Sequence, residues 1–169
     1  MIHLNINRAS NKLSKFESFL SNLSHTIKIV ALSENWLKDH NQALCNLYGY
    51  RSEHRFRPLR EGGGVSLLIK DDIEYFTRED LSLQSSYAES LFIEIDKRFT
   101  GKNQDAIVGV VYRPPDTDVK VFNDYLSSLL SKSKAEKKLL YILGDYNINL
   151  LNTNSHAATQ DFSDIMSSN

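Results

Sequence analysis

The chain has 169 residues, of which 41% are hydrophobic and 24% charged, and these proportions are typical of a globular domain. Its 20 basic and 21 acidic side chains give a net charge of −1, which excludes a general basic surface for nucleic acid and restricts such binding to a local patch. The single cysteine excludes an intrachain disulfide, and no apolar run reaches the roughly 20 residues that cross a bilayer. We therefore expect one intracellular domain with no signal peptide and no membrane contact.

The amino-terminal part of the chain predicts a strand, a helix and a second strand. Residues 2–7 alternate apolar and polar side chains, which is the pattern of a strand. Apolar residues recur at helical spacing over residues 11–23, and Ser10 suits the N-cap of this helix. Residues 27–32 are almost continuously apolar, as in a strand that is covered on both faces. Together they predict a βαβ unit.

Polar side chains stand where these two strands end. Asn5 and Asn7 close the first strand, and Glu34 follows the second. Ligands of open α/β sheets bind at the carboxyl ends of parallel strands, so we expect these three side chains to lie close together. The two asparagines alone fit a solvated face or a turn equally well. Their coincidence with Glu34 is what favours a functional site.

A polar and turn-rich stretch over residues 38–62 predicts a loop. It contains a cluster of five basic side chains within ten positions: Arg51, His54, Arg55, Arg57 and Arg60. Two interpretations stay open, a solvated loop and a local basic rim that binds phosphates of DNA. The glycines at positions 62–64 lack the lysine and the spacing of a phosphate-binding loop. They predict a close approach of the backbone to another segment.

The middle of the chain predicts four strands, over residues 65–69, 74–77, 90–95 and 106–111. No helix separates the second of these strands from the third, so we expect them to pair antiparallel. A polar loop is expected over residues 99–105.

The last of these strands ends in Tyr112-Arg113-Pro114-Pro115. Two prolines must end a strand, which places Tyr112 and Arg113 at its rim. There a tyrosine can bind a phosphate or a metal ligand, and an arginine can hold a phosphate through two donors. A tyrosine that packs at the strand end with a solvated hydroxyl is the alternative.

The carboxyl-terminal part predicts two helices around one buried strand. Apolar residues recur at helical spacing over 119–129, and Thr117 and Asp118 are candidate N-caps. A charged connection is expected over residues 131–138, and a last helix over residues 158–165.

The strand between these helices carries the strongest polar signal of the chain. Residues 139–143 are apolar, and Gly144, Asp145 and Asn147 follow them. We expect Gly144 to allow a tight turn and the two polar side chains, which share a parity, to point to the same side. An ordinary turn after a strand is the alternative.

Carboxylate, amide and phenol oxygens thus stand at four strand ends. Such oxygens are hard ligands that suit Mg²⁺ or Mn²⁺, whereas the sequence offers no Cys/His cluster for zinc. A Mg²⁺ ion with few protein ligands is usually shared with a substrate phosphate. The pattern therefore favours phosphodiester hydrolysis, in which the metal neutralises charge and a carboxylate positions water.

Five segments resemble the endonuclease/exonuclease/phosphatase superfamily: LNIN at 4–7, LSENWL at 32–37, GGGVSLLIK at 62–70, VVYRPP at 110–115 and LGDYNINL at 143–150. In order and spacing they most resemble the apurinic/apyrimidinic-type endonuclease domain of LINE-like non-LTR retrotransposons. The resemblance implies a two-sheet α/β sandwich and a nuclear enzyme that nicks target DNA so that the 3′-hydroxyl primes reverse transcription. A fused reverse transcriptase is then an expected partner.

The resemblance also implies a role for each polar side chain. Glu34 matches the principal metal-binding glutamate of the family, and Asn5 and Asn7 match the pair of residues near the metal. Many relatives have aspartate at the position of Asn7, so this chain carries one charge less there.

The remaining matches concern the reacting phosphate. Tyr112 matches a tyrosine that supports the phosphate and the transition state. Asp145 matches the aspartate that activates or orients the attacking water, and Asn147 the asparagine beside it. Apart from these matches, Arg113 at the strand rim and Arg51, Arg55 and Arg57 of the basic cluster are candidate contacts with DNA phosphates.

The carboxyl-terminal end departs from the family pattern. Relatives carry a later Ser-Asp-His segment and an upstream aspartate on further strands, and His156 lies too early to fill this role. We therefore expect residues 1–169 to form a single domain that lacks these strands and leaves residues 2–7 at an exposed sheet edge. Two alternatives to an active endonuclease stay open, an inactive remnant that binds nucleic acid weakly and a phosphatase of the same superfamily.

Overall fold

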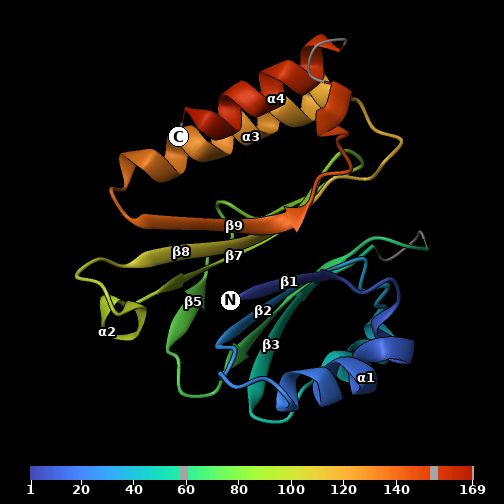
Figure 1. Ribbon diagram of the computed structural model, residues 1–169, viewed down its shortest axis with the longest axis vertical. Coiled ribbons are helices and arrows are strands. Elements are labelled where there is room, and N and C mark those ends of the chain that lie inside the picture. Colours follow the sequence, from blue (N-terminus) through green and yellow to red (C-terminus); the bar gives the residue numbers. More distant parts are fainter. Residues whose placement is uncertain (58–60, 153–155, 169) are drawn as a thin grey trace.

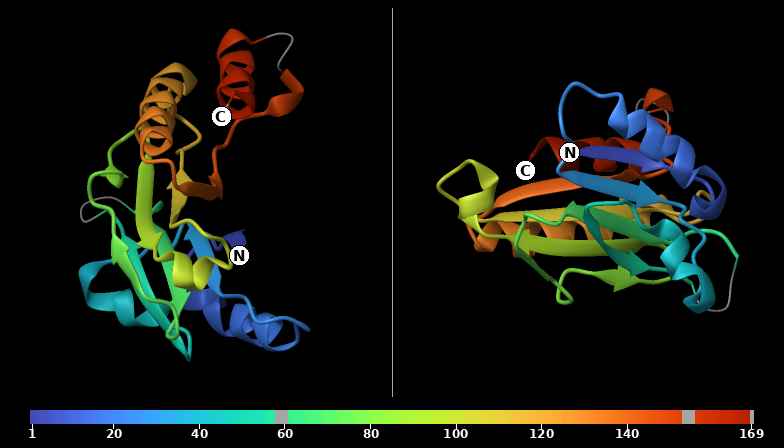
Figure 2. Two further views of the ribbon diagram at one scale, coloured as in Figure 1. Left: turned by 90° about the vertical axis from the view of Figure 1, so that its left-hand side faces the viewer. Right: turned by 90° about the horizontal axis from the view of Figure 1, so that it is seen from below.

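The computed structural model describes residues 1–57, 61–152 and 156–168. Two β-sheets pack face to face, and helices cover the outer face of each sheet (Figure 1). The view from the side shows the same order, with α3 (Val119–Ala135) and α4 (Ala157–Ser167) above the two sheets and α1 (Ala9–Ser21) below them (Figure 2, left). The expected two-sheet α/β sandwich is confirmed. No helix of the described residues is long and apolar enough to cross a membrane.

The first sheet contains four strands in the order β1-β2-β4-β3. Their bounds are Ile2–Asn5 for β1, Ile29–Ser33 for β2, Val65–Lys70 for β4 and Tyr50–Arg55 for β3. β1 and β2 are parallel, and helix α1 (Ala9–Ser21) connects them, as the alternation of patterns predicted. β4 runs antiparallel to both of its neighbours.

The second sheet has the order β5-β7-β8-β9, with β6 also paired to β7. The bounds are Tyr75–Thr77 for β5, Leu83–Gln84 for β6, Glu89–Ile95 for β7, Ala106–Tyr112 for β8 and Leu139–Asp145 for β9. β5 and β7 are antiparallel to each other, as expected. β8 and β9 are parallel, and helix α3 (Val119–Ala135) connects them.

The remaining elements are short or lie on the outside. They are helix α2 (Lys97–Thr100), helix α4 (Ala157–Ser167) and the 3-10 helices η1 (Asp39–Cys45) and η2 (Leu150–Asn152). α4 packs on α3, so both helices cover the second sheet (Figure 1).

Three apolar clusters hold the four layers together. One lies between the two sheets and includes Ala31, Leu67 and Ile93, each fully buried. A second packs α1 and η1 on the first sheet, and a third packs α3 and α4 on the second sheet around Phe122. The sheets therefore form a rigid frame whose strand ends fix the polar side chains.

Strands β1 and β9 each pair with a single strand among the described residues, and they lie side by side where the two sheets meet (Figure 1). The expectation that the first strand is a sheet edge is therefore confirmed. Both strands run toward the same side of the molecule, so their carboxyl ends lie together.

The prediction of a loop over residues 38–62 is wrong, because the segment contains η1 and the strand β3. β3 is an edge strand that pairs with β4 through its whole length. It reads YRSEHR in the sequence. An edge strand with partly exposed faces needs no apolar alternation, so periodicity could not reveal it.

Several expected boundaries also shift. β1 ends at Asn5 and not at Asn7. α1 begins at Ala9 without a side-chain cap, so the expected cap Ser10 lies inside the helix. α3 continues to Ala135, because buried Ser133 extends its packed face into the segment expected to be a charged connection.

Two local expectations concern helix ends and loops. Asp118 caps α3, since its carboxylate accepts a hydrogen bond from the backbone N of Lys120 at 2.7 Å. The expected polar loop at 99–105 begins inside α2, which ends at Thr100.

Candidate functional site

Polar side chains from both sheets meet at the carboxyl ends of the parallel strands. The amide nitrogen Nδ2 of Asn5 donates to Oε1 of Glu34 and to Oδ2 of Asp145, at 2.8 Å in each case. The hydroxyl of Tyr112 donates to the same Oε1 of Glu34 at 3.3 Å. We call Asn5, Glu34, Tyr112 and Asp145 the acid cluster.

The strand register explains why these residues meet. In the first sheet Asn5 lies opposite Ser33, so that Glu34 follows directly. In the second sheet Tyr112 lies opposite Asp145. Each sheet thus contributes one parallel pair of strands, and hydrogen bonds from Asn5 and Tyr112 join the ends of the two pairs. Sites of α/β proteins form at such strand ends.

Glu34 and Trp36 hold a strained backbone around a buried anchor. Their φ angles are 54° and 56°, in the left-handed region that costs residues with a side chain about 1–3 kcal/mol each. Asn35 between them is 1% exposed, and its Nδ2 donates to Oγ of Ser66 at 2.8 Å. Because Asn35 is fixed inside, Glu34 and Trp36 on either side of it line the surface.

The glycine segment lets this turn come close to the second sheet. A Cβ on Gly63 would lie 2.7 Å from Oε1 of Glu89, and one on Gly64 would lie 2.1 Å from Oδ1 of Asn35. Both glycines have positive φ, so other residues would also be strained there. The predicted close backbone approach is confirmed.

Glu89 is a buried carboxylate next to the site that sequence reasoning missed. It is 1% exposed, pairs with Nε of Arg57 and accepts from the backbone N of Gly64. Burial raises its pKa, while the nearby Arg57 opposes this effect. The available signal in the sequence was an acidic residue at the head of an apolar strand, and the structure places this residue directly opposite Tyr112.

Asp145 ends β9 and is held from two sides. Its Oδ2 accepts from Asn5, and its Oδ1 accepts from the backbone N of Asn147 at 3.1 Å. Gly144 remains within the strand, where a Cβ would lie 1.9 Å from the carbonyl oxygen of Val111. The expected tight turn at Gly144 is therefore wrong, and the glycine instead permits the close pairing of β8 and β9.

Asn147 does not point to the same side as Asp145. Its φ is 48°, and its Nδ2 donates to the carbonyl oxygen of Arg113 at 2.8 Å. The parity argument fails because β9 ends at Asp145 and the chain then leaves the extended conformation.

Arg113 is 2% exposed and organises the loops beneath the site. Its Nε donates to the carbonyl oxygen of Tyr146 at 2.6 Å, its Nη1 to Oγ1 of Thr117 at 3.1 Å and its Nη2 to the carbonyl oxygen of Asn147 at 2.5 Å. Every guanidinium nitrogen thus binds the protein itself. In this arrangement Arg113 supports Asn147 and does not face a phosphate.

Asn7 and His3 lie on either side of Asn5. The backbone N of Asn7 donates to Oδ1 of Asn5 at 3.2 Å, and with φ at 43° Asn7 leaves the strand. His3 lies two residues before Asn5, and burial lowers its pKa while the charge of Asp145 raises it. Its shared parity with Asn5 was the signal for its place at the site.

The basic side chains in and after strand β3 point to different places. Arg51 donates to the carbonyl oxygen of Ile73 and stacks on the ring of Tyr75, and Arg55 pairs with Glu79. Arg57 alone lines the same hollow as Glu34 and Tyr112. Arg60 lies outside the described residues.

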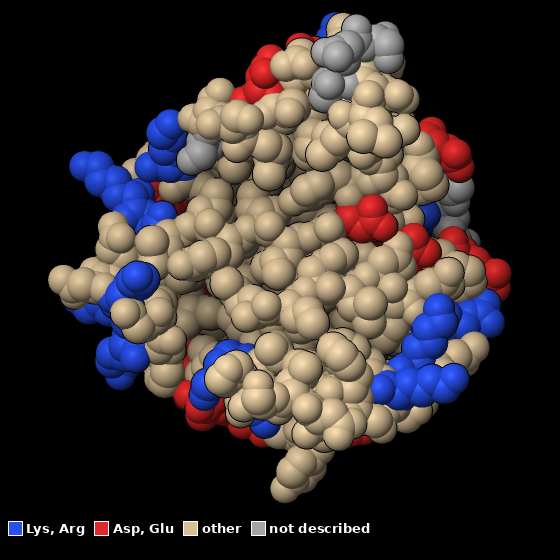
Figure 3. Space-filling model, viewed as in Figure 1, with Lys and Arg blue, Asp and Glu red and all other residues tan. Residues whose placement is uncertain are grey.

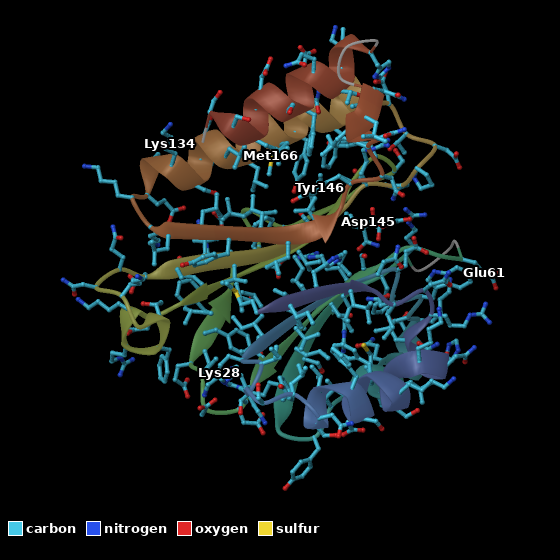
Figure 4. All side chains as sticks on the ribbon, in the orientation of Figure 1. Lys28, Glu61, Lys134, Asp145, Tyr146 and Met166 are labelled. Atoms are coloured by element: carbon cyan, nitrogen blue, oxygen red, sulfur yellow. The ribbon has the colours of Figure 1, made fainter. Side chains whose placement is uncertain are left out.

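Two hollows meet at the acid cluster. The first, of about 650 Å³, is lined by residues that include His3, Asn5 and Asp145. The second, of about 560 Å³, is lined by Glu34 and Tyr112 together with Trp36, Arg57 and Tyr87, and we call it the Trp36 hollow. On the face that carries β1 and β9, basic side chains gather near the rim and acidic atoms lie where Figure 4 labels Asp145 (Figure 3).

The carboxylates of the acid cluster have no cationic partner. Among the described residues no Lys or Arg forms an ion pair with Glu34 or Asp145. Tyr112 is 5% exposed, and burial together with the charge of Glu34 raises its pKa. The phenol therefore stays protonated and acts as a neutral donor.

The donor set fits a hard cation better than zinc. Within the described ranges no three His, Cys, Asp or Glu side chains gather to hold a metal. The carboxylates of Glu34 and Asp145 remain, together with the amide oxygen of Asn5, which accepts from the backbone N of Asn7 and keeps a second lone pair. Mg²⁺ takes few protein ligands and completes its shell with water and substrate oxygens, so this set suffices for it.

Comparison with known proteins shows the family. The sequence model described as "Endonuclease/Exonuclease/phosphatase family" matches residues 2–164. A search of curated protein sequences finds no match.

Solved structures share the fold at low sequence identity. AP endonuclease LMAP from Leishmania major superposes with a TM-score of 0.69 and 13% identity, over 98% of this chain and 65% of that one. The APE2 catalytic domain of Xenopus laevis gives 0.64 and 15%, over 95% and 65%. The 3′ phosphatase NExo from Neisseria, bound to product DNA hairpin, gives 0.60 and 14%, over 98% and 69%. The chain thus spans about two thirds of the length of these structures.

Proposed function

Because the chain belongs to the endonuclease/exonuclease/phosphatase family, we propose that it is a Mg²⁺-dependent DNA endonuclease whose acid cluster hydrolyses a phosphodiester bond. One observation carries the proposal. A single amide, Nδ2 of Asn5, joins a carboxylate from each sheet, and no cation of the described residues neutralises either carboxylate. Such a pair of acids needs a partner from outside the chain, and a metal with a phosphate provides one.

Glu34 and Asn5 would hold the metal, for which Mn²⁺ is a substitute. When bound, the metal supplies positive charge that neutralises the phosphate as negative charge develops on it. The strained turn keeps Glu34 at this place, because Asn35 is anchored to Ser66. Preorganised charge of this kind requires no rearrangement during the reaction.

Asp145 orients the attacking water and accepts its proton. Its two oxygens are fixed by Asn5 and by the backbone N of Asn147, and each keeps a lone pair for a water molecule. The neutral hydroxyl of Tyr112, which here donates its one proton to Glu34, would turn that proton to a phosphate oxygen when the substrate binds.

The biological setting of this proposal is target-DNA nicking by a retrotransposon endonuclease. Its support is the resemblance of five segments to LINE-like domains, together with structural relatives that are AP endonucleases. The partners would be DNA and a fused reverse transcriptase, and the enzyme would act in the nucleus.

A phosphatase of the same family is the second candidate. The observation that favours it is the likeness to NExo, which is described as a 3′ phosphatase. The same acid cluster would then hydrolyse a terminal phosphate instead of an internal phosphodiester.

The decisive experiment is nicking of supercoiled plasmid with Mg²⁺ and then with EDTA. We expect Mg²⁺-dependent nicking that falls at least about a hundredfold in both Asp145→Ala and Glu34→Gln. Asp161→Asn, an exposed acid on α4, serves as the control and should keep full activity. Full activity in either site variant would refute the assignment. Release of phosphate from a 3′-phosphorylated oligonucleotide without nicking would favour the phosphatase.

A further inference from the structure

The Trp36 hollow has features that hydrolysis at the acid cluster does not use. Its volume of about 560 Å³ is within the range of small-molecule sites, and two aromatic side chains outside the acid cluster, Trp36 and Tyr87, line it. Because Glu34 and Tyr112 also line it, a group bound in the hollow lies beside the acid cluster. From these features we infer that the hollow receives one unstacked nucleobase of the nucleic-acid substrate, on a nucleotide next to the reacting phosphate. This inference rests on the proposed function.

Two side chains of the hollow carry donors without acceptors. Nε1 of Trp36 and Nη2 of Arg57 are shielded from solvent and have no hydrogen-bond partner among the described residues. A buried donor that lacks an acceptor is costly, so most such groups in proteins are satisfied. Both atoms lie beneath the surface of the hollow, so the carbonyl oxygens of a nucleobase would supply the missing acceptors only after these two side chains turn toward it.

The charges of the lining favour a base over a phosphate. Arg57 is the cation of the hollow, and it is already paired with the buried carboxylate of Glu89. Glu34, Asp116 and Asp118 supply carboxylates on the same lining. A phosphate in the hollow would be repelled, whereas a neutral base can donate its N–H groups to carboxylates.

Neighbouring residues fix the position of the Trp36 indole ring. The backbone N of Trp36 donates to the carbonyl oxygen of Gly63 at 3.0 Å, and a Cβ on Gly62 would lie 3.8 Å from the ring. The guanidinium carbon of Arg8 lies 4.7 Å from the ring centroid and covers one face. Trp36 lines the hollow and Arg8 does not, so part of the indole surface faces the hollow away from the arginine. A fixed aromatic ring stacks on any base, because every base has a π-face.

The other hollow lacks these features. Its aromatic side chains Tyr146 and Phe162 pack on each other with ring centroids 5.4 Å apart, and Phe162 is 5% exposed. None of the orphaned buried donors belongs to a residue of this lining. The asymmetry places the base on the side of Trp36.

Trp36 is the single tryptophan of the chain, so its fluorescence reports on the hollow directly. The unmodified protein is titrated with a short oligothymidylate and with a base-free phosphodiester oligomer of equal length and charge, in Mg²⁺ and in EDTA. We expect saturable quenching by the oligothymidylate and about tenfold weaker binding of the base-free oligomer. Equal affinity for the two oligomers, binding without quenching, or binding of neither overturns the inference.

A variant pair tests the ring itself through the anisotropy of a labelled oligomer. Trp36→Leu should lose the preference for bases, whereas Tyr48→Leu, at an aromatic side chain that is 94% exposed, should keep it. Failure of this inference is distinguishable from failure of the proposed function. Plasmid nicking without base-dependent quenching would refute only the base site, and quenching without nicking would refute only the endonuclease.

Discussion

Strand β9 has a cluster of charged side chains at each end, and the two clusters are built on opposite principles. At its amino end Arg78, which is 9% exposed, donates to Asp80, Glu94 and Glu136. Lys138 pairs with the same two glutamates at 2.6 and 2.8 Å. Every charge there has a partner of opposite sign within the chain.

At the carboxyl end the carboxylates receive only neutral donors. Glu34 and Asp145 share the amide of Asn5, and no lysine or arginine of the described residues pairs with them. Figure 4 shows Asp145 at the carboxyl end of β9 and Lys134 near the end of helix α3, from which the chain enters the amino end of β9. The comparison separates a network that stabilises the fold from a site that requires a charged partner from outside.

The largest change in stability is expected when the ion pairs of Arg78 at the amino end of β9 are removed. Arg78→Met leaves Glu94, which is 5% exposed, with one cationic partner fewer and should lower the free energy of unfolding by about 3 kcal/mol. Arg98→Met removes a pair whose side chains are 71% and 42% exposed and should cost much less stability, because solvent screens such a pair. Urea denaturation of both variants measures the difference, and equal losses would contradict the distinction.

Mg²⁺ should stabilise the protein through the acid cluster and not through the ion pairs of Arg78. Saturating Mg²⁺ at a hundred times its dissociation constant should raise the free energy of unfolding by about 2.7 kcal/mol. Thermal unfolding with and without Mg²⁺ tests this, and Asp145→Asn should reduce the gain while Arg78→Met should keep it. An identical gain in the Asp145 variant would argue against the metal at the acid cluster.

Acid should weaken the network in a defined pH range. The bonds from Arg78 and Lys138 lower the pKa of Glu136 from 4.5 to about 2. Because the folded pKa lies below the unfolded one, this stabilisation is complete above about pH 5 and is lost as the pH falls toward 2. The unmodified protein loses unfolding free energy as the pH falls through that range, and Glu136→Gln should reduce this loss by about 1 kcal/mol. A curve as steep as that of the unmodified protein would exclude the effect.

The smallest change in stability is expected at the site itself. Asp145→Asn removes one of two acids that share a donor, so the free energy of unfolding should change by less than about 1 kcal/mol and can rise. The same denaturation experiment measures it beside Arg78→Met. A loss as large as that of Arg78→Met would mean that Asp145 holds the fold together and is not primarily a functional group.

Most elements could be predicted from the sequence because each carries its own periodicity. The strands β2, β7 and β8 are apolar and buried throughout, and the prediction of their places holds to within two residues. Strand β3 was missed because an edge strand needs no such pattern. The side-chain directions of Asn7 and Asn147 were missed because both residues leave the extended conformation, with φ at 43° and 48°.

The sequence alone determined which chemistry stands at the strand ends, since Glu34, Tyr112 and Asp145 follow apolar runs that must form strands. Tertiary structure alone decided which of the surrounding groups reach that place. Arg113 turns into the loops, Arg57 pairs with a buried glutamate, and Asn5 joins two sheets. The reason is physical: periodicity is a property of neighbours in the chain, whereas the partner of a charge is set by strands that are far apart in sequence and meet only when the two sheets pack.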